Sequence, residues 1–313
     1  MRAVVTGGAG FIGSHLSERL HEAGHDVLVI DDLSSGEGRV PILAKLGISF
    51  ERADIREESA AAAIRSYRPE AVCHLAAQID VRRSVADPVH DASVNVLGTL
   101  RILEAARACG ARVLFASSGG TIYGEVPPEH LPAGEETIGR PTAPYGITKR
   151  VAEDYLRFFG TTYGLPFVSL ALANVYGPRQ DPHGEAGVVA IFTSKLLAGE
   201  PCVVYGDGGQ TRDFVFVDDV VDAFVAALDR GTGETVNIGT GIETTVNDLY
   251  ERIAAICGVG EPASRAPERA GELRQSALDA RKAERVLDWR PATSLDDGLA
   301  RTVEWFRENA RAS

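Results

Sequence analysis

The sequence predicts an α/β fold in which a doubly wound parallel sheet carries helices on both faces, and three features of the chain support this prediction. Apolar runs typical of buried strands recur along the first half, segments of helical periodicity separate them, and a glycine-rich turn follows the first run. This alternation favours parallel strands joined by right-handed helical crossovers. The predicted strands are residues 3–5, 26–30, 48–51, 71–75, 112–116 and 167–171.

The first predicted unit is a strand, a glycine-rich turn over residues 6–13, a helix and a second strand that ends at Asp31. Gly7, Gly10 and Gly13 let the turn tighten, let backbone N–H groups approach phosphate oxygens and let the helix pack close to the sheet. The N-terminus of the helix then faces negative charge. These are the requirements of a dinucleotide pyrophosphate site, whereas an ordinary glycine-rich turn would not need the strand, helix and carboxylate together.

The carboxylate at the end of the second strand indicates which dinucleotide binds. Asp31 follows Gly13 by 18 residues, which places it to accept hydrogen bonds from the hydroxyls of an adenosine ribose. Its negative charge would repel a 2′-phosphate. The sequence therefore favours NAD over NADP.

The length of the chain predicts more than one domain. Because 313 residues exceed one typical domain, we expect a Rossmann-type NAD-binding domain over residues 1–175 and a smaller α/β substrate-binding domain over 176–313. Some segments of the second are expected to return to the first. After about Tyr176 the elements become shorter, with predicted strands at 202–205 and 235–238 and helices at 246–257 and 295–307.

Composition restricts the classes of partner. The formal net charge of −12 argues against nucleic acid or an anionic membrane as the main partner. No signal peptide, membrane-length apolar stretch or lipidation motif is evident, so a cytoplasmic location is expected. No metal site or disulfide framework is predicted, because the four cysteines are far apart: Cys73, Cys109, Cys202 and Cys257.

Tyr145 and Lys149 stand four residues apart in a segment predicted to be helical, so their side chains share one face. A nearby cation favours the phenolate, so Tyr145 is expected to exchange a proton with a substrate hydroxyl, although free tyrosine titrates near ~10. A solvated helix face is the alternative for such a pair. The upstream dinucleotide unit, and Ser117 and Ser118 at the end of a predicted strand, favour catalysis.

Together these motifs resemble the extended short-chain dehydrogenase/reductase family, and within it the nucleotide-sugar 4-epimerases that act on UDP-glucose and UDP-galactose or on UDP-glucuronic acid. The resemblance covers nearly the whole chain. It rests on residues 6–13, 31–36, 54–55, 74–78, 95–99, 117–124, 145–149, 174–179, 206–217 and 237–239.

The resemblance implies that NAD lies across the first domain, with Tyr145 as the catalytic base and Lys149 also holding the nicotinamide ribose. It implies that the pyrophosphate contacts Gly7, Gly10, Phe11, Ile12 and Gly13, and that the adenosine ribose contacts Asp31, Asp32, Ser34, Ser35 and Gly36. The adenine would contact Asp54 and Ile55, and the path to the nicotinamide would be lined by Leu75, Ala76, Ala77, Gln78 and Asn95.

The resemblance also implies a UDP-sugar site under the second domain. Arg212 and Arg269 match arginines that grip the diphosphate, which suits a guanidinium group. Tyr205 and the strand before it match the uracil-binding strand, and Asn174 matches a sugar or phosphate contact. The remaining residues expected to contact the substrate are Ser117, Ser118, Thr121, Tyr145 and Val188.

The chain departs from the family pattern at one catalytic position. Gly119 stands where the epimerases carry the serine or threonine that bridges the substrate hydroxyl and the base. Thr121 is the favoured replacement, Ser118 is second, and Ser117 is a third hydroxyl nearby. The loop over residues 119–121 also lacks the carboxylates that the related dehydratases and decarboxylases use, so elimination of water is disfavoured.

The expected reaction is inversion at C4 of a UDP-hexose through a transient 4-keto sugar. UDP-glucuronic acid and UDP-N-acetylglucosamine are alternative substrates. Arg82 or Arg179 could meet the C6 carboxylate of the first. For the second, Ser276 matches a position where the family uses a bulky tyrosine to exclude N-acetyl sugars. A nucleotide-sugar 4,6-dehydratase and a non-catalytic NAD-binding protein are two rival functions. The resemblance further implies a homodimer that pairs through helices at about 91–109 and 145–159.

Overall fold

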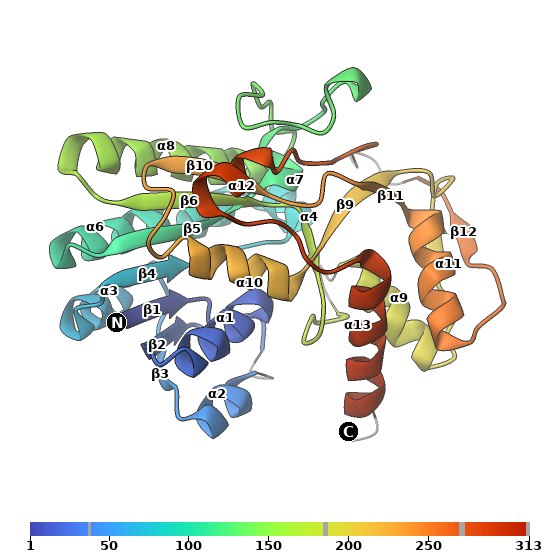
Figure 1. Ribbon diagram of the computed structural model, residues 1–313, viewed down its shortest axis with the longest axis horizontal. Coiled ribbons are helices and arrows are strands. Elements are labelled where there is room, and N and C mark those ends of the chain that lie inside the picture. Colours follow the sequence, from blue (N-terminus) through green and yellow to red (C-terminus); the bar gives the residue numbers. More distant parts are fainter. Residues whose placement is uncertain (37–38, 184–186, 269–272, 311–313) are drawn as a thin grey trace.

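The computed structural model describes residues 1–36, 39–183, 187–268 and 273–310, and a seven-stranded parallel sheet forms its centre (Figure 1). The strand order is β10-β6-β5-β4-β1-β2-β3. Strands β4 and β6 are buried along their whole length, as expected for strands covered on both faces. The predicted fold class is confirmed. The strands are β1 Arg2–Thr6, β2 Asp26–Asp31, β3 Ser49–Arg52, β4 Ala71–His74, β5 Arg112–Ser118, β6 Phe167–Leu172 and β10 Glu234–Ile238.

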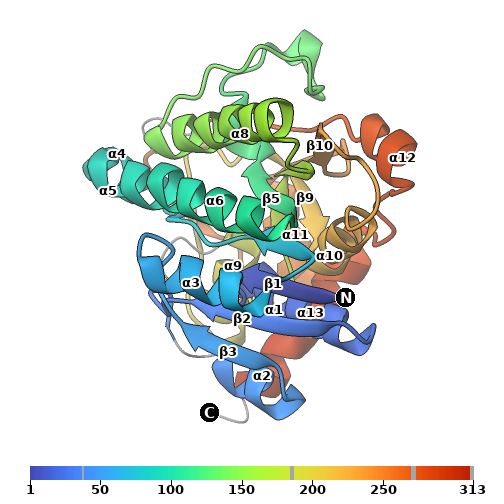
Figure 2. The same cartoon turned by 90° about the vertical axis from the view of Figure 1, so that its left-hand side faces the viewer.

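Helices cover both faces of this sheet, and Figure 2 shows the two layers on opposite sides of it. On one face α1 packs against α10, with Leu16, Leu20 and Phe224 fully buried. On the other face α3 packs against α6, with Ile64 and Ile102 fully buried. The helices are α1 Phe11–Glu22, α2 Val40–Leu46 and α10 Val217–Ala226 on the first face, and α3 Glu58–Tyr67, α6 Thr99–Cys109 and α8 Pro144–Tyr163 on the second.

A smaller group of elements stands beyond the carboxyl ends of the large sheet (Figure 1). Its helix α11 begins where the Thr245 hydroxyl accepts a hydrogen bond from the Asp248 N–H and ends at Gly258, which has a left-handed backbone conformation. Phe192 and Ile253 are buried in its core. The elements are β7 Asn174–Tyr176, β9 Thr211–Phe216 and β11 Glu243–Thr245 in one sheet, β8 Val203–Tyr205 and β12 Ser264–Ala266 in another, and α9 Val188–Leu197, α11 Val246–Cys257 and α13 Leu295–Ala310.

Parts of the carboxyl-terminal half return to the large sheet. Strand β10, predicted over 235–238 without an assigned partner, pairs in parallel with β6, so that Val236 lies opposite Leu170. Helix α10 packs on α1, and helix α12 (Arg281–Leu287) contacts β10. The sheet edge next to β6 is therefore built from residues distant in sequence.

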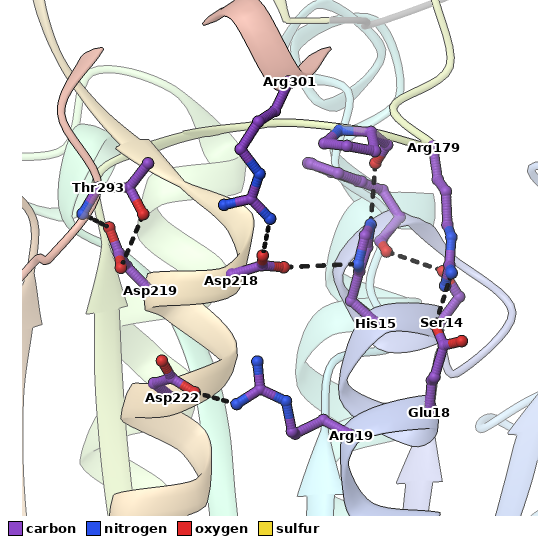
Figure 3. A network of polar contacts seen from close by, with 12 residues as sticks. Ser14, His15, Glu18, Arg19, Arg179, Asp218, Asp219, Asp222, Thr293 and Arg301 are labelled. Carbon is purple, nitrogen blue, oxygen red and sulfur yellow. Dashed lines mark hydrogen bonds and ion pairs between the residues drawn. The ribbon is translucent and has the colours of Figure 1, made fainter. Parts of the chain in front are cut away.

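A polar network joins α1 to the carboxyl-terminal half of the chain (Figure 3). His15 Nε2 lies 2.9 Å from the carbonyl oxygen of Pro178, and His15 Nδ1 lies 3.8 Å from the carboxylate of Asp218. Arg301 of α13 contacts the same carboxylate. These contacts fix the helix behind the glycine-rich turn against its neighbours. Further pairs are Arg19 with Asp222, Arg179 with Glu18, and Thr293 with Asp219.

The helix predicted near residues 91–109 consists of three pieces. It starts within α5 (Pro88–Ala92), continues through η1 (Ser93–Gly98), which is a π-helix, and ends as α6. Single π-helical turns within α-helices are frequent at functional sites. The preceding α4 (Val81–Ala86) packs against α5 and α8.

Within the described residues, no helix is both long and apolar enough to span a membrane. The same part of the chain shows no cluster of three or more His, Cys, Asp or Glu residues that could hold a metal ion. The four cysteines are free thiols, and Cys73 and Cys202 are buried.

Candidate active site

The glycine positions of the turn after β1 leave no room for a side chain. Gly7 has a left-handed backbone with φ of 69°, and a Cβ at Gly13 would lie 2.1 Å from the Gly7 carbonyl oxygen. Helix α1 begins immediately afterwards at Phe11, with no side-chain cap and no acidic residue in its first turn. The first N–H groups of a helix have no partner within it, so Phe11, Ile12 and Gly13 present donors and positive potential at this point. The turn therefore fits a pyrophosphate.

Asp31 closes this turn from the end of β2. Its carboxylate accepts hydrogen bonds from the N–H groups of Ala9 at 3.0 Å and Leu33 at 2.9 Å. Burial raises the pKa of Asp31, and these two hydrogen bonds oppose that rise. Asp32 accepts the N–H of Ser34 at 2.9 Å, so the residues predicted to hold the adenosine ribose form one turn. Ser35 and Gly36 complete that turn.

The residues predicted for adenine follow β3. Asp54 receives a two-pronged hydrogen bond from the Arg56 guanidinium, which holds the pKa of Asp54 below its ordinary value. Ile55 is buried, and its side chain is the nearest neighbour of Gly98 in η1. The structure thus places Ile55 between the sheet and the helix that carries Asn95.

The segment after β4 is fixed to the same helix. The Gln78 N–H donates to Asn95 Oδ1 at 2.8 Å, and Asn95 Nδ2 donates to the Gln78 carbonyl at 2.9 Å. Leu75, Ala76 and Ala77, which precede this reciprocal pair, are half-buried. These residues therefore lie along one carboxyl edge of the sheet with the glycine-rich turn.

Tyr145 lies in the first turn of α8 and meets the end of β5. Hydrogen bonding from Ser118 lowers the pKa of its phenol, and Lys149 Nζ lies 5.8 Å from the centre of its ring. Lys149 is almost completely buried and donates to the carbonyl of Ala116 at 2.7 Å. Ser118, Tyr145 and Lys149 thus form one cluster.

The contacts in the structure favour Ser118 over Thr121 as the hydroxyl that interacts with the Tyr145 phenol. Thr121 Oγ1 donates to the Ser118 carbonyl at 3.3 Å, and Ser117 Oγ is buried without a hydrogen-bond partner among the described residues. A Cβ at Gly119 would lie 2.3 Å from a methyl group of Leu278. A serine or threonine at 119 would therefore require the Leu278 side chain to move.

The expectation that Lys149 makes the phenol acidic is wrong for this arrangement. Burial raises the pKa of Tyr145 to about 12, the Ser118 hydrogen bond lowers it, and the charge of Asp91 raises it further. Burial also lowers the pKa of Lys149 to about 8, although Asp91 and Glu153 favour its charged form. Burial is the largest cause of both shifts, and it disfavours the charged form of each group.

The residues predicted for the UDP-sugar come from the second group of elements. Asn174 is exposed on β7 near Gly120, and Val188 begins α9. Tyr205 ends β8 and lines a narrow pocket with Gln210 and Arg274. Arg212 lies on β9, with Nη1 2.7 Å from the Thr211 carbonyl, whereas Arg269 lies outside the described residues.

A separate cavity of about 700 Å³ contains none of the predicted site residues. Leu278 and Trp289 line it, together with residues 129–132 and 239–241. Because Leu278 also contacts Gly119, this cavity adjoins the Tyr145 cluster but does not open on the phenol.

Sequence reasoning missed Asp91 and Thr148. Asp91 is fully buried and accepts hydrogen bonds from Gln78, Asn95 and Thr148. Its place four residues before Asn95, on the same face of the predicted helix, was the signal that could have found it.

Comparisons with known proteins identify the family to which this chain belongs. The sequence pattern of the "NAD dependent epimerase/dehydratase family" matches residues 3–239. The chain is 49% identical to a "UDP-glucose 4-epimerase" of Mycolicibacterium smegmatis over 315 aligned positions, which cover 99% of this chain and 100% of the relative.

Two solved structures are similar over almost their whole length. A UDP-glucose 4-epimerase of Thermotoga maritima with UDP-glucose has a TM-score of 0.96 and 47% identity, covering 99% of this chain and 100% of that one. A UDP-glucose 4-epimerase of Thermus thermophilus in complex with NAD has a TM-score of 0.91 and 44% identity, covering 98% and 99%. The resemblance inferred from the motifs is confirmed, and the chain belongs to the NAD dependent epimerase/dehydratase family.

Proposed function

We propose that this protein is an NAD-dependent 4-epimerase that interconverts UDP-glucose and UDP-galactose through a transient 4-keto sugar. The observation that carries the proposal is the cluster of Ser118, Tyr145 and Lys149 at the end of β5, on the same carboxyl edge of the sheet as the glycine-rich turn. The full-length identity with relatives named as UDP-glucose 4-epimerases supports the choice of sugar.

The residues present fit NAD. The uncapped start of α1 suits the pyrophosphate, and a carboxylate at Asp31 suits an unphosphorylated adenosine ribose. Gln78, Asn95 and Lys149 are proposed to hold the nicotinamide half. The chemistry that NAD supplies when bound is the reversible uptake of a hydride from a carbinol carbon.

The side chains of this chain handle the proton and the orientation of the sugar. In its phenolate form Tyr145 takes the proton of the 4-hydroxyl at its phenolic oxygen, and it returns that proton when the sugar is reduced again. Ser118 donates to that oxygen, which favours the phenolate. Arg212 and Arg269 are proposed to hold the diphosphate, so that the 4-keto sugar can turn over without leaving the site.

The alternative substrates are tested directly by supplying three UDP-sugars to the purified protein. We expect UDP-glucose to yield UDP-galactose faster than UDP-N-acetylglucosamine or UDP-glucuronic acid is converted. Arg179, one of the two arginines considered for a C6 carboxylate, pairs with Glu18 in the structure. Faster conversion of either alternative would reassign the substrate, and no conversion of any UDP-sugar would refute the proposed function.

A homodimer through η1 and α8 is part of the proposal. Leu97 is 59% exposed and Phe158 is 46% exposed, and Ile147 and Tyr155 add exposed apolar surface along α8. Because η1 and α8 contact each other, these side chains belong to adjoining helices. Contiguous apolar surface of this kind marks an interface.

We expect the double variant Leu97→Glu, Phe158→Glu to be a monomer, because four like charges would face one another across a two-fold axis. Multi-angle light scattering would measure this, with Ile138→Glu as a control, since Ile138 is 84% exposed outside this surface. A monomeric unaltered protein, or a double variant that remains dimeric, would contradict the assignment.

A further inference from the structure

A buried carboxylate lies beneath the proposed active site and has no place in the mechanism above. Asp91 belongs to α5 and is fully buried. Its Oδ1 accepts from Gln78 Nε2 at 2.8 Å and from Asn95 Nδ2 at 3.1 Å, while its Oδ2 accepts from Thr148 Oγ1 at 2.8 Å. These donors are neutral, so none of them compensates a negative charge on Asp91. Burial of an ionised carboxylate is costly, and purely structural hydrogen bonds could be made by a neutral side chain.

The hydrogen bonds of Asp91 connect both halves of the site. Gln78 and Asn95 belong to the edge proposed to face the nicotinamide, and they also pair with each other. Thr148 stands beside Lys149, and its hydroxyl also lies 3.0 Å from the Tyr145 carbonyl. Asp91 therefore fixes the first turn of α8, which carries the base, to the segment after β4.

The charged and titratable groups around Lys149 come from three elements besides its neighbour Tyr145. Asp91 faces it from α5, Glu153 from the next turn of α8, and His74 from β4. Glu153 is also buried, but it accepts from Ser169 and makes no contact with Gln78 or Asn95. Asp91 and Glu153 thus both favour the charged form of Lys149, and of these two carboxylates only Asp91 also raises the pKa of Tyr145.

We propose that Asp91 is a positioning residue of the active site. It holds Gln78 and Asn95 in place relative to Tyr145 and Lys149, and it places a fixed negative charge beneath that pair. This inference rests on the proposed function for its kinetic consequences. Its consequences for NAD retention do not require turnover of a sugar.

Three variants separate the hydrogen bonds from the charge. Thr148→Val removes one link to Asp91 and leaves the charge in place. Glu153→Gln removes a nearby charge and leaves the links in place. Asp91→Asn alters both, because an amide brings a donor to a position where every partner is already a donor.

We expect Asp91→Asn and Thr148→Val to release NAD about 10-fold faster than the unaltered protein, the lower end of the 10- to 100-fold range known for residues that orient metal ligands from behind. The release rate would be followed as loss of bound NAD after rapid gel filtration of the holoenzyme. Glu153→Gln should release NAD at the unaltered rate. Melting curves of all variants would confirm folding, and Thr148→Val carries the test should Asp91→Asn fail to fold.

The pH profile of kcat gives a second readout that a merely structural role would not move. Loss of the Asp91 charge lowers the pKa of both Tyr145 and Lys149, so both limbs of the profile should move to lower pH in Asp91→Asn by about one unit. Only the limb set by Lys149 should move in Glu153→Gln, because Glu153 acts on Lys149 and not on Tyr145, and neither limb should move in Thr148→Val.

Unchanged NAD release in both Asp91→Asn and Thr148→Val would overturn the positioning role. An unmoved pH profile in Asp91→Asn would overturn the role of the charge. If the unaltered protein converts no UDP-sugar, the proposed function fails, whereas the NAD release rates still decide the inference about Asp91.

Discussion

Replacement of Tyr145 by Phe is expected to lower kcat for UDP-glucose by about 100-fold or more, because general acid-base catalysis contributes at least this much when its proton carrier is removed. The ring remains, so packing of the first turn of α8 and binding of NAD should be preserved. Steady-state kinetics and the NAD content of the purified variant would measure both effects.

A matched tyrosine on the same helix provides the control for that variant. Tyr163 is exposed at the end of α8, where Arg107 lies over its ring and Phe158 and Phe159 make edge contacts with it. Tyr163→Phe keeps those contacts and should retain full turnover. Turnover of Tyr145→Phe within about 3-fold of the unaltered protein would remove the phenol from the mechanism, since that is far below the magnitude of acid-base catalysis.

Replacement of Gly13 by Ala is expected to abolish NAD retention and to destabilise the fold by about 3 kcal/mol, the upper part of the usual range for overpacking. The added methyl group would lie 2.1 Å from the Gly7 carbonyl oxygen and 2.7 Å from Gly8 Cα, and both are backbone atoms. Relief requires that the turn open, which separates the N-terminus of α1 from the phosphate position.

The NAD content of purified Gly13→Ala and its thermal unfolding would test this expectation. Gly260→Ala is the control, because a Cβ at Gly260 would meet nothing within 4 Å. A Gly13→Ala protein that carried a full complement of NAD would show that the turn does not hold the pyrophosphate.

The parts of the fold that depend on residues close together in the sequence were predictable. The glycine-rich turn, the carboxylate at Asp31 and the buried apolar runs are all local features, and the structure forms the expected strands from them. The place of β10 was not predictable, because its pairing with β6 brings Val236 opposite Leu170 although the elements of the smaller group lie between them in the sequence. No local pattern specifies such a partner.

The proposed site was predictable in its residue types but not in its contacts. The spacing of Tyr145 and Lys149 identified the pair, yet the choice between Ser118 and Thr121 depends on which hydroxyl lies at the phenol in the folded chain. The pKa of Tyr145 was misjudged, because desolvation depends on burial by the whole fold. Asp91 was missed because its partners belong to three separate segments.

The proposed reaction requires a hydride that leaves C4 of the sugar and returns to the same carbon within one site. The most direct measurement uses UDP-glucose deuterated at C4 in ordinary water, with the UDP-galactose product examined by mass spectrometry and NMR. We predict that the product retains its deuterium at C4. Product that carries protium from water at C4, or a 6-deoxy-4-keto sugar in place of UDP-galactose, would contradict this mechanism.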